Sequence, residues 1–324
     1  MPNLASSGIE LAVPGIERIL SRANRSTVPG RDYLSTLYPL FGYIEAVDTD
    51  LPEGVVSYLA EGGEVDGECF MRADPVHLRP DRDRLLLFDS TSLALCPEEA
   101  ETIAGEFNRH FSTDGMRLLT PHPERWYLQL ENCPALRTSS LTEVVGQHIE
   151  SFMPTGEDAR LWRQRLNEIQ MLLFQSQVNR QREDNGRLTI NGVWLSGSGR
   201  LPMLSPRTSF TVIADELNAL GLGQLAGLPT LRLSDSGSGH WPDAQECLMV
   251  WMDLLEPVLH ADPLAWTEAM QAVEGRLQRL VDSMRNQGQS CLELYPCNGR
   301  VFILTPSTLR RFWRRRNRMR DYLI

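Results

Sequence analysis

The chain has 324 residues and a formal net charge of −10, with 42% hydrophobic and 23% charged residues. This size is enough for about two domains with a substantial core, and the acidic balance argues against a general attraction to nucleic acid or anionic lipid. All 32 basic residues are arginines, which a GC-rich genome explains and which also suits bidentate contacts with phosphate.

The cysteine pattern indicates reduced thiols. No two cysteines form a Cys-x-x-Cys pair, so we expect no zinc site, and a chain of this length needs no disulfide framework. The N-terminus lacks a basic segment followed by an apolar run, and no stretch approaches 18 apolar residues. We therefore expect a cytoplasmic protein without a membrane span. The six cysteines are Cys69, Cys96, Cys133, Cys247, Cys291 and Cys297.

The first half of the chain alternates helix and strand patterns. Apolar residues at helical spacing predict a helix over 13–23, with a proline near its start. Apolar runs predict strands at 85–88 and 126–130. Between them, a proline followed by acidic residues predicts a helix over 97–110.

The second half continues this alternation, which favours an α/β fold. A long amphipathic helix is predicted over 158–177, and a central strand at 188–195 runs into the glycine-rich segment 196–202. A strand that ends in such a loop is where open α/β sheets bind ligands. Further along, we predict helices at 210–220 and 264–285 and strands at 248–252, 292–295 and 300–304.

Three groups of residues carry a family resemblance. The first is 67–77, Gly-Glu-Cys-Phe-Met-Arg-Ala-Asp-Pro-Val-His. The second runs from the helix at Leu166 through 177–182, Gln-Val-Asn-Arg-Gln-Arg, to 190–202, Ile-Asn-Gly-Val-Trp-Leu-Ser-Gly-Ser-Gly-Arg-Leu-Pro. The third is the C-terminal order of strand, acidic-to-histidine loop, long helix and strand. Over roughly residues 55–305 this order resembles the archaeal-type branch of the cofactor-independent phosphoglycerate mutases.

Two shorter passages, Ala-Asp-Pro-Val-His-Leu at 73–78 and Glu-Ile-Gln-Met at 168–171, are also similar to a bacterial group of RpfE-type regulatory proteins. The family resemblance implies an α/β fold of the alkaline phosphatase superfamily, with a mixed or parallel sheet flanked by helices. It further implies that 1–54 and 166–324 form this core, and that 55–165 form an inserted, smaller α+β domain of the substrate-binding type.

The resemblance also implies a two-metal phosphate transfer to a serine nucleophile. The family supplies an early aspartate, the serine, an Asp-x-x-x-His pair and a late Asp-His pair. In this chain no aspartate precedes Asp32, and the expected nucleophile segment, 30–35, offers Ser35 as a candidate. An ordinary loop serine explains Ser35 equally simply.

The metal-ligand positions are altered too. The Asp-x-x-x-His position matches Glu256 and His260, with Asp262 just beyond. These oxygen donors leave one Mn or Mg site as an alternative to a solvated loop. The late pair should fall at 295–298, where neither residue occurs, and the glycine- and serine-rich segment 235–240 offers another Asp–His pair. We expect no cofactor and no intact catalytic site.

The side chains suited to a phosphorylated or carboxylated ligand match the family pattern better than the metal-ligand positions do. Each candidate also has a structural explanation: Arg72 and Asp74 as an ion pair, the histidine as a structural residue, the asparagines as caps and the glycines as turn residues. Arg200 follows two glycines whose amides can face an anion. The candidate ligand-binding residues are Arg72, Asp74, His77, Arg125, Asn179, Asn191, Gly197, Gly199 and Arg200.

The tail is strongly basic. Its aromatic neighbours are Phe312, Trp313 and Tyr322, and contact with nucleic acid or an acidic membrane is one interpretation. We favour a helix with a docked apolar face and a solvated basic face. The arginines are Arg310, Arg311, Arg314, Arg315, Arg316, Arg318 and Arg320.

Three functions follow from these patterns. We expect a phosphoglycerate mutase-like protein with a degenerate metal site, non-catalytic or regulatory, that binds a phosphorylated metabolite or a protein partner rather than nucleic acid. The first alternative is an active metal-dependent mutase or phosphatase with a rearranged site. The second is a nucleic-acid-binding regulator that acts through the basic tail.

Overall fold

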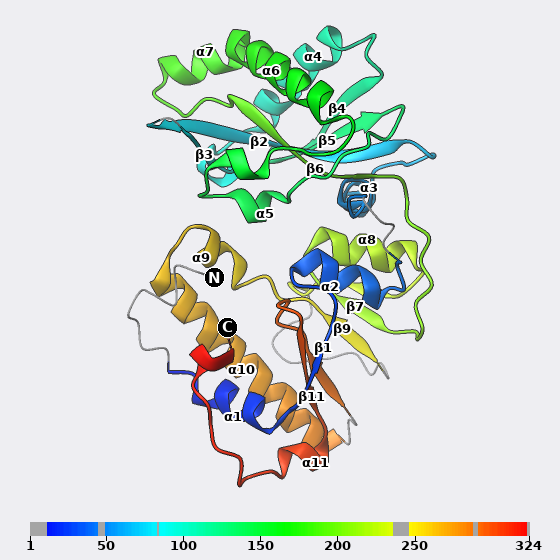
Figure 1. Cartoon of the computed structure of the whole chain (residues 1–324), viewed down its shortest axis with the longest axis vertical. Helices are drawn as coiled ribbons and strands as arrows, with labels where there is room; N and C mark the ends of the chain where they lie inside the picture. Colours follow the sequence, from blue (N-terminus) through cyan, green and yellow to red (C-terminus); the bar gives the residue numbers. More distant parts are fainter. Residues whose placement is uncertain (1–11, 45–48, 83, 236–245, 288–290, 323–324) are drawn as a thin grey trace. The chain divides into compact units, whose positions relative to one another are not determined.

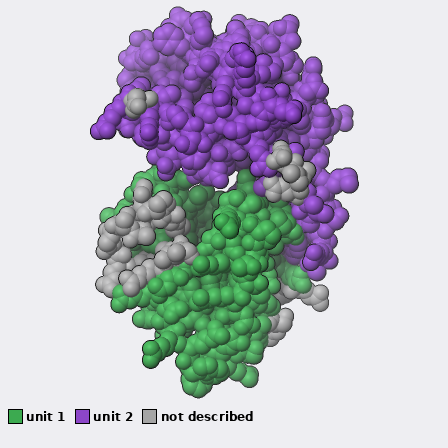
Figure 2. Space-filling model, viewed as in Figure 1, with its two compact units in different colours: residues 1–40, 231–324 green, residues 41–230 purple. Residues whose placement is uncertain are grey.

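The structure is a computed structural model that divides into two compact units (Figure 2). Unit 1 comprises residues 1–40 and 231–324, and unit 2 comprises residues 41–230. The insertion over 55–165, inferred from the resemblance, stays a prediction. The residues that the structure describes are 12–44, 49–82, 84–235, 246–287 and 291–322.

Unit 2 is an α/β assembly around an antiparallel sheet of five strands (Figure 1). Its elements are α3 (Glu53–Ala60), β2 (Cys69–Asp81), β3 (Arg84–Phe88), α4 (Pro97–His110), β4 (Met116–His122), β5 (Arg125–Leu130), α5 (Leu141–Val144), α6 (Ala159–Gln175), α7 (Gln177–Asp184), β6 (Gly192–Gly199), β7 (Thr211–Ile213) and α8 (Leu217–Leu225), with β8 (Thr230–Leu231) at the unit boundary.

Strand β2 organises this sheet because it is 13 residues long. The strand order is β3-β2-β5-β4, and β6 also pairs with β2. Helices α4, α6 and α7 cover one face, while α3 and α5 lie on the other (Figure 1). The first face holds the main core, in which Phe107 of α4 and Trp162 of α6 pack with Met71, Trp126 and Leu195 of the sheet.

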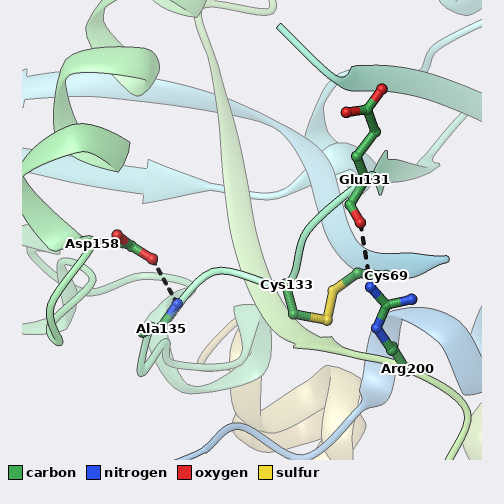
Figure 3. The surroundings of a disulfide bond; sticks show 6 residues. All are labelled: Cys69, Glu131, Cys133, Ala135, Asp158 and Arg200. Atoms are coloured by element: carbon green, nitrogen blue, oxygen red, sulfur yellow. Dashed lines mark hydrogen bonds between the residues drawn. A yellow bond between two sulfur atoms is a disulfide. The ribbon is translucent and has the colours of Figure 1, made fainter.

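A disulfide joins Cys69 and Cys133, which are 64 residues apart (Figure 3). Cys69 opposes Leu130 in the pairing of β2 with β5, so Cys133, three residues later, returns to within 5.3 Å of Cys69 between Cα atoms. The expectation of reduced thiols is therefore wrong for this pair. It rested on spacing along the chain, whereas antiparallel pairing brings distant cysteines together.

Unit 1 combines the two ends of the chain. A three-stranded antiparallel sheet of order β1-β11-β10 lies with α1 and α10. Its core includes Ile16 and Leu20 of α1, Met270 and Val281 of α10, and Phe302 of β11. The elements are α1 (Pro14–Arg22), β1 (Asn24–Thr27), α2 (Tyr33–Leu40), β9 (Cys247–Met249), α9 (Leu255–Leu259), α10 (Pro263–Gln287), β10 (Leu292–Leu294), β11 (Arg300–Leu304) and α11 (Pro306–Leu309).

The predicted α/β class is confirmed, as are the helices over 97–110 and 264–285. The predicted helix at 210–220 is wrong at its start, where the β-branched residues of β7 form a strand before α8 begins. The central strand also continues through Gly199 instead of ending before the glycine-rich segment. No helix among the described residues has the length and apolarity that crossing a bilayer requires.

Candidate functional site

A group of polar side chains lies on the α3 face of the unit 2 sheet; we call it the β2 polar cluster. It consists of Glu53, Arg72, Asp74, Tyr127 and Ser196. Side chains alternate between the faces of a strand, so Arg72 and Asp74 share this face. The strand register sets Arg72 opposite both Tyr127 on β5 and Ser196 on β6.

The Arg72 guanidinium is bound within the cluster. Its Nε donates to Asp74 Oδ2 at 3.1 Å, its Nη2 donates to Asp74 Oδ1, and its Nη1 donates to the Tyr127 hydroxyl at 3.3 Å. The Arg72 and Asp74 side chains are only 12% and 3% exposed. Burial alone would lower the pKa of Arg72, but the adjacent carboxylate of Asp74 more than reverses this and the pKa is raised. The ion pair proposed as an alternative from sequence is therefore present.

Glu53 adds a second carboxyl group at the start of α3. Ser196 Oγ lies 3.4 Å from Glu53 Oε2 and donates to it. Burial raises the pKa of Glu53 from 4.5 to about 7, although the charge of Arg72 opposes this rise. The cluster can therefore gain or lose a proton near neutral pH.

The two candidate glycines let α3 approach β6 closely. A Cβ at Gly197, whose φ is +60°, would lie 2.4 Å from Glu53 Cβ, and a Cβ at Gly199 would lie 2.6 Å from Pro52 Cβ. The Gly197 amide donates to Thr138 Oγ1 at 3.0 Å. In this structure the two glycines therefore serve packing, and the Gly197 amide has a protein partner.

Both candidate asparagines bind backbone groups. The Asn179 amide donates to Leu173 O and Ile190 O at 2.7 Å each, and its oxygen accepts from Ile190 N at 2.8 Å. Asn191 accepts from Leu78 N at 2.6 Å and donates to Leu78 O at 2.8 Å. These contacts fix the chain where it leaves α7 and enters β6, as the capping alternative predicts.

Each of the remaining candidates has its own protein partner. His77 Nδ1 is 2.8 Å from Thr189 O. Arg125 Nε donates to Glu61 Oε1 at 2.6 Å, with its side chain 36% exposed. Arg200 Nη2 donates to Glu131 O at 3.2 Å, beside the disulfide (Figure 3). The sequence candidates thus converge at Arg72 and Asp74, where the charge of Arg125 also acts on the Asp74 carboxylate and Gly197 packs against Glu53.

Glu53, Tyr127 and Ser196 were not predicted from the sequence pattern. The alternation of Arg72 and Asp74 marks one strand face, but their partners depend on the register of β5 and β6. Only Ser196 carries a usable sequence signal, because it opens the glycine-rich segment that was already singled out.

In unit 1 the expected nucleophile segment meets the segment where the late Asp–His pair was expected. Val28 N donates to Gly299 O at 3.0 Å. Cys297 lies in the second of these segments, 295–298, and has a φ of +57°. Burial raises the pKa of its thiol, against a hydrogen bond with Thr36, and the charge of Asp32 adds to the rise. A protonated thiol is a weak nucleophile and a weak metal ligand.

Ser35 belongs to the N-terminal cap of α2. Ser35 N donates to Asp32 Oδ1 at 2.9 Å, and Ser35 Oγ accepts from the backbone N–H groups of Arg31 and Asp32 at 3.1 and 3.3 Å. The Ser35 hydroxyl in turn donates to Asp32 Oδ2. This reciprocal arrangement is a capping box.

The predicted metal candidates lie where α9 ends and α10 begins. His260 follows α9, and its backbone N–H donates to Glu256 O at 3.0 Å. Asp262 Oδ1 accepts from Leu264 N and Ala265 N at 3.0 Å each, which caps α10. Within the described ranges, no three His, Cys, Asp or Glu side chains are grouped so as to hold a metal ion. Residues 236–245, and with them the predicted ligand at position 240, lie outside those ranges.

Among the described residues, no group of three donors matches the two-metal site that the resemblance implies, and its degeneracy stays a prediction. A metal ligand needs a free lone pair directed at the ion. Asp32 and Asp262 both direct carboxylate oxygens at helix N–H groups instead.

Comparison with known proteins supports a distant relationship. No family model matches the chain. A probable 2,3-bisphosphoglycerate-independent phosphoglycerate mutase from Geobacter sulfurreducens is 24% identical over 168 residues, which are 50% of this chain. The match spans less than half of that relative, 42% of its length.

Two solved structures are similar. The PH0037 protein from Pyrococcus horikoshii has a TM-score of 0.51 and 12% identity, over 91% of this chain and 80% of its own. The cofactor-independent phosphoglycerate mutase from Thermoplasma acidophilum has a TM-score of 0.42 and 14% identity, over 94% of this chain and 85% of its own. The first likeness supports the α/β fold, and the archaeal-type and RpfE-type assignments stay predictions. Half of the chain is thus distantly similar in sequence to a probable 2,3-bisphosphoglycerate-independent phosphoglycerate mutase.

Proposed function

We propose that this protein binds a phosphorylated metabolite on a phosphoglycerate mutase-like scaffold without transferring the phosphate. The observation that carries the proposal is the capping box at α2. The Ser35 hydroxyl accepts two backbone N–H groups and donates to Asp32. Attack on phosphate needs a serine that is free to lose its proton and approach phosphorus. Here that movement would leave the N–H groups of Arg31 and Asp32 without their acceptor and break the Ser35 side of the capping box.

The neighbouring positions support the same proposal. Cys297 stands where the late Asp–His pair was expected, and its pKa is raised, first of all by burial. Asp262 is occupied as the cap of α10. A degenerate site of this kind favours a binding or regulatory role over turnover.

Arg125 is the ligand contact that we favour. Its side chain is 36% exposed, its Nε is held by Glu61, and its charge acts on the carboxylate of Asp74. A guanidinium fixed along one edge can still present its other edge to a phosphate. Arg72 is less suitable, because its three nitrogen atoms are bound within the cluster.

Calorimetry with 3-phosphoglycerate tests the proposal. The chelator-treated protein is titrated with and without Mn²⁺, and turnover is assayed in parallel. We expect binding without turnover in both conditions, and weaker binding for Arg125→Gln. Arg160→Gln is the matched control, because Arg160 is an exposed arginine on α6 of the same unit.

Each other outcome has a definite meaning. Turnover with Mn²⁺ would make the protein an active mutase or phosphatase with a rearranged site. Absence of binding would exclude the metabolite as the ligand and leave a protein partner as the remaining candidate. The Cys69–Cys133 disulfide removes the cysteine-based support for a cytoplasmic location, so location forms no part of this proposal.

A further inference from the structure

Unit 1 contains a cavity of about 580 Å³ that the proposed function does not use. It lies between the end of α1, the start of β1 and the chain that follows α11. We call it the arginine pocket. Its lining residues are Ser21, Ala23, Asn24, Arg25, Arg314, Arg315 and Asn317.

The tail is anchored on the C-terminal end of α1. Arg314 Nη1 is 3.5 Å from Ser21 O and 3.4 Å from Ala23 O. Arg311 Nη1 donates to Asn24 Oδ1 at 2.7 Å. The last carbonyls of a helix lack intrahelical partners and attract cations. These contacts hold the tail arginines in place before any ligand arrives.

The pocket has positive charge that its own residues do not neutralise. Its lining contains three arginines and two asparagines but no acidic side chain. Arg315 is exposed, and among the described residues no partner is recorded for its guanidinium. Arg25 lies over the Tyr322 ring, 4.9 Å from the centroid, which orients its guanidinium and leaves the charge intact. Such a surface suits phosphate groups.

Two exposed aromatic rings stand next to these arginines in the chain. Phe312 is 81% exposed and Trp313 is 68% exposed, with their ring centroids 5.3 Å apart. Exposed rings beside arginines form the stacking platforms on which single-stranded nucleic acids bind.

The backbone conformation of the tail also favours nucleic acid over a membrane as the ligand. The predicted tail helix is wrong, because α11 ends at Leu309 and the chain over 310–318 consists of turns, a bend and irregular backbone. The tail therefore lacks the continuous helix with one apolar face by which amphipathic anchors lie in a membrane interface. A concave pocket lined by arginines instead fits a phosphodiester chain.

We propose that the arginine pocket and the adjacent aromatic pair bind single-stranded nucleic acid. Arg25, Arg314 and Arg315 contact phosphates, and Trp313 stacks on a base. The net charge of −10 opposes this binding over the rest of the surface, so the affinity is modest and strongly dependent on salt.

Fluorescence anisotropy of the full chain with a labelled 12-nucleotide oligo-U and with oligo-dT tests the proposal. Three phosphate contacts predict a slope of about −2 for log affinity against log salt, or a roughly 15-fold loss between 50 and 200 mM salt. We expect Arg315→Gln to lower the slope by about 0.7. Trp313→Ala should weaken binding several-fold at an unchanged slope.

The matched control is Arg276→Gln, which removes one positive charge from α10 in the same unit, where Arg276 pairs with Asp253 at 2.6 Å. It should leave the affinity unchanged. Binding that Arg315→Gln and Trp313→Ala leave intact, or no binding at 50 mM salt, would overturn the proposal. Phosphatidylserine vesicles that bind the chain more tightly than either oligonucleotide would assign the pocket to a membrane instead. None of these readouts depends on Arg125, so this test and the metabolite test fail separately.

Discussion

The β2 polar cluster and the arginine pocket use the same residue type in opposite ways. In the cluster, Arg72 is buried and compensated by Asp74. In the pocket, Arg315 is exposed and the lining has no acidic residue. A buried arginine stabilises the fold only while its partners remain, whereas an exposed one contributes little to stability and remains available to a ligand.

Arg182 offers the strongest case of a buried, compensated arginine. Its side chain is 1% exposed and donates to Glu99 at 2.8 Å and to Leu188 O at 2.6 Å. Arg182→Ala takes this donor from Leu188 O, removes one of the two arginines that pair with Glu99, and should lower the free energy of unfolding by about 3–5 kcal/mol. Arg187 pairs with the same Glu99 at 3.0 Å but is 41% exposed, so Arg187→Ala should lower it by at most about 1 kcal/mol. Urea unfolding compares the two, and equal losses would contradict the contrast.

Removal of the disulfide of unit 2 should have the second-largest effect on stability. It closes a loop between residues 64 apart, and a bond of this kind restricts the unfolded chain by about 2–4 kcal/mol. Cys133→Ser should therefore lower the urea midpoint, and a reductant should lower the midpoint of the wild type to a similar value. Cys291→Ser is the control, because Cys291 is an exposed free thiol. A reductant that leaves the wild type unchanged would show that the bond does not stabilise the fold.

Glu53 makes the cluster sensitive to pH. Burial raises its folded pKa from 4.5 to about 7, so the folded state holds a proton that the unfolded state releases. This stabilisation is complete below about pH 4.5 and is lost as pH rises through about 7. Relative to Glu53→Gln, the wild type should therefore lose roughly 2–3 kcal/mol between pH 4 and pH 8. Parallel pH profiles for the two proteins would refute the buried proton.

The smallest stability effect belongs to Arg315. Its exposed guanidinium has no recorded partner in the described part of the chain, so Arg315→Gln should change the free energy of unfolding by less than about 0.5 kcal/mol. Thermal unfolding provides the measurement, alongside the binding change expected above. A loss of 2 kcal/mol or more would show that Arg315 supports the fold, which would weaken its assignment to a ligand.

The sequence predicted features that depend on local periodicity. A proline followed by acidic residues located the start of α4, the helix over 264–285 matches α10, and an ion pair between Arg72 and Asp74 was among the alternatives. The Arg182–Glu99 pair was not predicted, because its members are 83 residues apart. Contacts of this kind depend on strand register and helix packing, which the pattern of any single segment does not contain.

The pairing of β1 with β11 has a consequence for how the chain folds as it is made. Asn24 opposes Ile303, so β1 lacks its sheet partner until nearly the whole chain has been synthesised. At ribosomal speeds of about 5–20 residues per second, the wait is roughly 15–55 s. During that time unit 2 can fold alone, because its sheet is complete once Gly199 has emerged. The N-terminal segment meanwhile needs protection from aggregation, so a molecular chaperone should associate with the nascent chain mainly through residues of α1 and β1.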